Sequence, residues 1–206
     1  DPIESMAEVN ITPPRGIALN LIDAGSVAVD AVSISLPAAV NTTGAINLMA
    51  AATGNITAGS TITAGGGFSI PRAKGVTFGG LVSADSLSIA QGAGESVEAV
   101  SVGSGGVTTV NDLRIRTTVA GAGNGISTLG SLAAGGAATL ALESARGVDT
   151  TGSISAGDIL LSGAAVTIRG GTGAADDATL SSSGAININA DFIAGDDVTV
   201  LQASAL

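Results

Sequence analysis

A short phrase recurs along the chain and constrains its fold more than any other feature. A glycine or another small residue is followed by an apolar residue, two small residues, a turn residue and an alternating apolar strand; clear copies begin at Gly54, Gly80, Gly130 and Gly152. The anchor positions 58, 84, 110, 134, 156 and 194 are separated by 26, 26, 24, 22 and 38 residues, and we interpret the last interval as two units of about 19. A drifting period of this size is typical of a solenoid with constant strands and variable corners.

Alternation of apolar and polar residues, as at 165–168 and 187–189, predicts short strands. Aromatic residues make up only 1% of the chain, so the core must consist of stacked aliphatic ladders. We therefore predict an all-β fold, a right-handed parallel β-helix of about eight or nine coils of roughly 19–26 residues. The residues expected to point inward are Ile56, Ile62, Leu87, Ile89, Leu113, Ile115, Ile154, Ile159, Val166, Ile168, Ile186, Ile188, Val198 and Val200.

The domain organisation expected is an extended lead-in over residues 1–16, which contain three prolines, followed by one β-helix domain over residues 17–206 that is a fragment of a longer fibre. Irregular sequence at 71–80, 90–106 and 117–125 predicts projecting loops. No window shows the apolar periodicity of an amphipathic helix.

Charge excludes several classes of partner. The net charge is −10 and Lys74 is the only lysine, which predicts repulsion of nucleic acid and of anionic membranes. The uncharged stretch 31–71 is interrupted by asparagine and glycine, so we expect no transmembrane segment. The acidic opening, with Asp1 and Glu4, does not resemble a secretory signal; we expect a mature product or an excised segment, located outside the cell or on a bacterial outer surface.

The repeats at 54–65 and 184–190 resemble those of filamentous haemagglutinin-like exoproteins and high-molecular-weight adhesins, and the similarity covers roughly residues 40–206. It is a style of repeat, and the family's Asn-Pro-rich secretion signature is not seen in this chain. The resemblance implies a β-helical fibre, export by a partner pore or as an autotransporter passenger, and a role in adherence, aggregation or biofilm.

Histidine and cysteine are both absent, which removes the usual nucleophilic triads and most zinc sites. The remaining candidates are two carboxylate pairs about 20 residues apart, one coil apart on the same side of a rod, at Asp176, Asp177, Asp196 and Asp197. Such pairs suit calcium, or the acid and base of glycoside cleavage. The third interpretation is structural, because aspartate favours turns, and Asp85, Asp112 and Asp158 occupy similar positions. We expect no catalytic residue and no cofactor, with calcium as the one open alternative.

Three other features carry alternatives. Arg114 and Arg116 share the outward face of one strand, where they would clamp an acidic sugar or form ion pairs with neighbouring coils. Outward threonines suggest ice binding, but they do not follow one strict register. Three sequons are candidates for glycosylation, at Asn10, Asn41 and Asn55.

The function expected from the sequence is a non-catalytic bacterial fibre segment that displays or spaces a binding surface, with a receptor or glycan on a host or neighbouring cell as its partner. Two other classes remain open. A self-assembling fibre or surface-layer subunit would associate end to end through open strand edges. A β-helical polysaccharide hydrolase or lyase would need clustered carboxylates and arginine in a groove.

Overall fold

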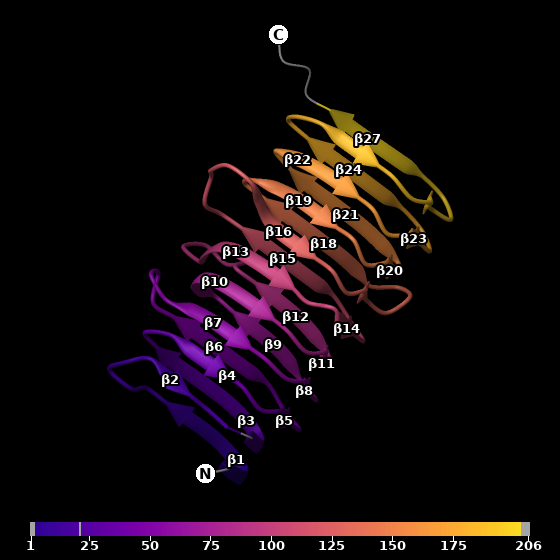
Figure 1. The fold of residues 1–206 in the computed structure, drawn as a ribbon. Helices are drawn as coiled ribbons and strands as arrows, with labels where there is room; N and C mark the ends of the chain where they lie inside the picture. The colour runs from indigo at the N-terminus through magenta and orange to yellow at the C-terminus, as the bar shows by residue number, and fades with distance from the viewer. Residues whose placement is uncertain (1–2, 21, 203–206) are drawn as a thin grey trace.

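The computed structural model describes residues 3–20 and 22–202, and the side chains from residue 8 onward apart from residue 21. Every regular element in this part of the chain is a β-strand. The strands stack in order from the N-terminus to the C-terminus along one axis (Figure 1) and form an 18-stranded and a 9-stranded sheet. Within the described residues the paired strands are all parallel, as are β10 and β13. The predicted parallel β-helix is confirmed, with about ten turns instead of eight or nine.

Each regular turn contributes one strand to each of three parallel ladders. The first ladder contains β5 (Val40–Thr42), β8 (Ile62–Ala64), β11 (Val82–Ala84), β14 (Val107–Thr109), β17 (Leu132–Ala133), β20 (Ile154–Ala156), β23 (Thr172–Ala174) and β26 (Phe192–Ile193). The second contains β6 (Ile46–Ala50), β9 (Gly67–Ile70), β12 (Ser86–Ile89), β15 (Leu113–Thr117), β18 (Thr139–Ser144), β21 (Asp158–Gly163), β24 (Ala178–Ser182) and β27 (Val198–Gln202). The third contains β2 (Ile17–Ala18), β4 (Ile34–Leu36), β7 (Asn55–Ala58), β10 (Arg72–Phe78), β13 (Ser96–Val102), β16 (Asn124–Thr128), β19 (Gly147–Thr150), β22 (Ala165–Ile168) and β25 (Ile186–Ile188).

The first turns begin with two long strands, β1 (Ile3–Ile11) and β3 (Ile22–Ala31), which pair with each other in parallel. β3 extends across both of the first two ladders, because its beginning pairs with β5 and its end pairs with β6. The segment 1–16, expected as an extended lead-in, therefore contributes a strand to the first turn; residues 1 and 2 lie outside the described part. Charged residues and the prolines that follow had hidden the alternation in this strand.

Turn length varies while the ladders stay in register. Equivalent residues are 17 positions apart between Ile17 and Ile34 and 27 apart between Leu113 and Leu140. The long interval from 156 to 194 does contain two turns. Ala156 pairs with Ala174 of β23, and β23 in turn pairs with β26.

Two registers expected from the repeat are wrong. The anchor at position 110 is one residue late, because Thr109 is the partner of Ala84. Positions 58 and 84 are not equivalent, because Ala58 pairs with Phe78 in the third ladder. The partner of Val82, in the strand that contains position 84, is Ile62. The error arises because similar phrases, small residue then alternating strand, open both the first and the third ladder.

Two of the three segments expected as loops contain a strand. Residues 71–80 contain β10, and residues 90–106 contain β13. In both segments charged side chains occupy outward or partly exposed positions and obscure the buried alternation. The third prediction is confirmed in part, because residues 118–123 form an exposed loop between β15 and β16.

Aliphatic side chains from the three ladders fill the inside of the coil. The residues expected to point inward are buried as far as Ile168, whereas Ile186 is partly buried. In the last described turn, Ile188, Val198 and Val200 are exposed. No further described turn covers them. Two aromatic rings also lie in the core: the ring centroids of Phe68 and Phe78 are 5.8 Å apart and both side chains are fully buried.

Two buried threonines stack inside the third ladder, Thr128 against Thr150, and neither hydroxyl has a hydrogen-bond partner among the described residues. An unpaired buried hydroxyl keeps its desolvation cost without compensation. We expect Thr150→Val to stabilise the protein by about 1 kcal/mol, because valine has nearly the same shape and no polar atom. Urea unfolding followed by far-ultraviolet circular dichroism measures this change. Thr167→Val, at a partly exposed position on the outside of the same ladder, is the control; an equal gain there would contradict the explanation.

Candidate functional site

Aspartates gather at the corner between the first and second ladders, where they precede or begin the strands of the second ladder. The carboxylate of Asp112 accepts the backbone N–H of Thr139, one turn further on, at 3.0 Å. Asp158 accepts from the N–H of Asp177 at 3.4 Å, and Asp177 accepts from the N–H of Asp197 at 3.1 Å. These aspartates therefore link consecutive turns by capping the next backbone amide, as the structural interpretation of the sequence expects.

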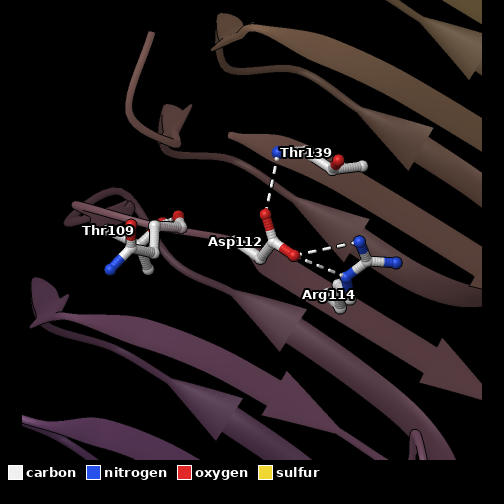
Figure 2. Close-up of polar contacts among 5 residues, drawn as sticks. Thr109, Asp112, Arg114 and Thr139 are labelled. Atoms are coloured by element: carbon white, nitrogen blue, oxygen red, sulfur yellow. Dashed lines mark hydrogen bonds and ion pairs between the residues drawn. The ribbon is translucent and has the colours of Figure 1, made fainter. Parts of the chain in front are cut away.

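Asp112 has the most complete set of contacts at this corner (Figure 2). One carboxylate oxygen accepts the N–H of Thr139, and the other accepts the Nε and Nη2 of Arg114 at 3.1 and 2.9 Å. On the same corner, Thr109 donates its hydroxyl to the carbonyl of Asn111 at 2.7 Å. The hydrogen bond from Thr139 holds the pKa of Asp112 below its usual value; partial burial opposes this shift and Arg114 adds to it.

Asp112→Asn should cost about 1 kcal/mol at pH 7, a modest amount because the carboxylate side chain is 45% exposed. Since the folded pKa is lowered, this stabilisation is present above the unfolded pKa and is lost as pH falls through the folded pKa. Urea unfolding of both proteins between pH 7 and pH 2 should show a difference that disappears at the acidic end. A difference that is independent of pH would show that the carboxylate charge contributes nothing.

The two carboxylate pairs do lie one turn apart on the same side of the rod. Asp196 donates its N–H to the carbonyl of Asp176 at 3.1 Å. Carboxylate oxygens of Asp176, Asp177 and Asp196 lie within 4.8 Å of one another, and all three residues are exposed. Asp197 is not in this group. Such an arrangement could hold a hard cation, but exposed acids also gather without one, so calcium stays a hypothesis.

Repulsion within this group changes the titration of Asp176. The negative charge of Asp177 raises the pKa of Asp176, with smaller contributions from loss of solvent and from the charges of Asp158 and Asp196. A raised folded pKa means that folding is favoured at low pH and that this advantage is lost as pH rises through the folded pKa.

Asp176→Asn should therefore be more stable than the natural chain at pH 7 in the presence of a chelator, and the difference should vanish below the unfolded pKa. Thermal unfolding between pH 3 and pH 7 measures this. Repeating the pH 7 measurement with added Ca²⁺ tests the calcium hypothesis, because a bound ion would raise the midpoint of the natural chain and not that of the variant. A variant less stable than the natural chain in the chelator would contradict the repulsion.

Arginines brace the corner between the second and third ladders. The Nε of Arg116 donates to the carbonyl of Ala90 at 2.7 Å, and Arg72 donates in the same way to Ala50 at 2.9 Å. Arg146 donates its Nε to a carbonyl in the 118–123 loop and pairs with Glu98 at 2.9 Å. These side chains hold each corner against the preceding turn.

The two outward arginines singled out in the sequence are thus occupied separately. Arg114 pairs with Asp112 on its own turn instead of with an acid on a neighbouring turn, whereas Arg116 binds backbone carbonyls. Among the described residues neither contributes to a shared anion clamp, so the structure does not bring them together as the sugar-binding alternative requires.

The predicted glycosylation acceptors Asn10, Asn41 and Asn55 are exposed, on β1, β5 and β7 respectively. Their modification stays a prediction. The threonines considered for ice binding are divided among ladders: Thr57 and Thr77 pair in the third ladder and Thr63 lies in the first. The outer column of the third ladder is also interrupted by a charged residue, Asp149.

Sequence reasoning missed a groove at the second corner, between the second and third ladders near the C-terminal end of the rod. The groove has a volume of about 680 Å³ and is rich in serine; its lining residues are Ser144, Ala145, Ser162, Gly163, Ala164, Ser181, Ser182, Ser183, Val200, Leu201 and Gln202. The run of three serines at 181–183 was the one available signal. These serines form part of a groove only because four turns stack on one another, and the linear sequence does not show this stacking.

Residues 3–20 and 22–202 include no helix that is long and apolar enough to cross a membrane. Comparisons with family models, with curated proteins and with solved structures found no match to this chain.

Proposed function

We propose that this chain is a non-catalytic rod segment of a secreted or surface-attached bacterial fibre, which displays or spaces binding surface in adhesion, aggregation or biofilm. The main support for the proposal is that the ionisable side chains of the chain form hydrogen bonds between neighbouring turns. Asp112 and Asp177 cap backbone amides of the next turn, and Arg116 braces the preceding one. In an enzyme, carboxylates and guanidinium groups would face a substrate. In this chain they connect the turns of a regular rod.

Surface composition also supports this function. The chain carries a net charge of −10 and no cysteine. Outward positions along the ladders are mainly hydroxyl-bearing or small, as in the pairing of Ser83 with Thr63 and Thr108. A polar, acidic surface stays soluble at an exposed location, and a continuous aliphatic core needs no disulfide to be stable.

A self-assembling fibre subunit is the second candidate, and one observation favours it. The last described turn exposes apolar side chains, with Ile193 63%, Val200 53% and Leu201 56% accessible. Sedimentation velocity at low and high salt tests this alternative. The acids Asp196 and Asp197 beside this face should make any association stronger in high salt, where their repulsion is screened.

Adhesion is tested with beads coated with the purified chain, incubated with cells and with arrayed glycans while the supernatant is assayed for released sugar. Saturable adherence without sugar release is the expected result. Beads carrying Asp176→Asn together with Asp177→Asn should adhere equally well. Sugar release by the natural chain and not by this double variant would replace the proposal with a hydrolase or lyase. Beads that neither bind nor cleave would refute adhesion by this segment and leave it as a spacer.

A further inference from the structure

The serine-rich groove, lined as described above, runs along the rod where β18, β21, β24 and β27 end. Strands β18, β21 and β24 stack directly on one another and β24 pairs with β27, so the groove crosses four consecutive turns. At about 4.8 Å per turn, the floor of the groove extends roughly 14 Å along the axis. Its volume of about 680 Å³ falls in the range of small-ligand sites.

Three hydroxyls in this groove are unengaged within the described residues, those of Ser162, Ser181 and Ser183. Ser162 and Ser181 pair across β21 and β24, and neither side chain makes a hydrogen bond within the described residues. In contrast, Ser144 shares a hydrogen bond with Thr117 at 2.8 Å, and Ser182 donates to the carbonyl of Ala164 at 3.1 Å. The groove therefore offers three free hydroxyls, two of them one turn apart, on a floor that other hydrogen bonds hold in place.

The lining selects a neutral partner. No lining residue is ionisable, although the whole chain carries a charge of −10. Serine hydroxyls donate and accept hydrogen bonds, which matches a ligand that itself carries hydroxyls. Leu201, which pairs with Ser181 in the outward column, adds exposed apolar surface at one end of the groove, suited to the C–H face of a sugar ring.

A peptide strand suits this groove less well. Peptides commonly bind sheets by adding a strand to a free edge, through main-chain hydrogen bonds. Strands β18, β21 and β24 are each paired on both sides, so their edges are already used. What the groove presents is side-chain hydroxyls, and these favour a polyol over a polypeptide.

We propose that this groove binds a short stretch of a neutral linear glycan. The inference deepens the adhesive function proposed above and rests on it. Ser162 and Ser181 donate to and accept from successive sugar hydroxyls along the rod axis, while Leu201 contacts a ring face.

The test uses the full chain, ¹⁵N-labelled, titrated with neutral hexasaccharides of β-1,4-glucan, β-1,3-glucan and α-mannan. We expect saturable shifts of groove amides with at least one of them. Ser181→Leu, which fills the groove, should weaken that binding at least tenfold. Ser88→Leu is the matched control, because Ser88 is also a partly exposed outward residue of the second ladder but does not line the groove, and its affinity should equal that of the natural chain.

Three results would overturn the inference: no saturable shift with any neutral hexasaccharide, equal binding by Ser181→Leu, or shifts confined to residues outside the groove. Titration with an unrelated extended peptide and with an acidic hexasaccharide completes the test, and preference for either would also overturn it. These failures are distinguishable from failure of the proposed function. If the natural chain and the Ser181→Leu variant make beads adhere to cells equally well, the adhesive function stands and the groove is not its binding site.

Discussion

Phe68→Ala should lower the free energy of unfolding by about 3–5 kcal/mol, the range for truncating a buried phenylalanine. Phe68 lies in β9 with 1% of its surface accessible, and its ring contacts that of Phe78 at a centroid distance of 5.8 Å. The core is otherwise built from smaller aliphatic side chains held in ladders. Because paired strands fix the positions of these ladders, neighbouring side chains have little freedom to collapse into the space left by the ring.

Urea unfolding followed by far-ultraviolet circular dichroism measures this effect, since the chain has no tryptophan or tyrosine to report by fluorescence. Phe192→Ala is the matched control. It makes the same chemical change in β26, where the side chain is only partly buried, and it should cost clearly less. Equal losses at the two positions would mean that packing around Phe68 is looser than the structure indicates.

Gly54→Ala should be nearly as damaging, because it introduces a methyl group where the backbone of the preceding turn already lies. A Cβ atom at Gly54 would lie 1.6 Å from the carbonyl oxygen of Val32. The obstacle is main chain and cannot be relieved by a rotamer change. The two turns would have to separate, which also strains the hydrogen bond that the backbone N–H of Lys74 donates to the carbonyl of Gly54 at 2.7 Å. We expect a loss of about 3 kcal/mol.

Gly173→Ala serves as the control for this substitution. Gly173 lies within β23, and a Cβ atom there would meet nothing within 4 Å. Alanine at this position should leave stability unchanged or raise it slightly, because it restricts the unfolded chain. The midpoints of thermal unfolding of the two variants measure this difference in stability. A Gly54→Ala protein as stable as Gly173→Ala would show that the turns do not approach as closely as described.

The fold was predictable because its determinant is periodic. Alternation at Ile154, Ile159 and Ile168 identified buried strands without any knowledge of their partners, and these residues are buried. The register of the strands was harder to predict, since Ala58 and Ala84 occupy the same place in similar phrases but lie in different ladders. A linear pattern records that a corner occurs but does not say which of the three corners it is.

The candidate sites show the same limit. The two aspartate pairs were correctly placed one turn apart, because their spacing of 20 equals a turn length found in this part of the rod. Their use as amide caps, such as Asp177 on Asp197, depends on which way each carboxylate faces. The groove was invisible for a different reason. Two of its free hydroxyls, on Ser162 and Ser181, are 19 residues apart and become neighbours only through stacking.

The direction of the ladder hydrogen bonds has a mechanical consequence. Hydrogen bonds between stacked turns run along the rod, so tension between its two ends loads every interface in series. When the hydrogen bonds between two stacked turns break, one turn unfolds, and the next interface between turns then carries the load. A released turn of 17 to 27 residues adds roughly 60–95 Å of extended chain. A rod of this construction therefore lengthens in discrete steps under shear, and its unravelled turns act as a tether that dissipates a pull before the whole structure is lost.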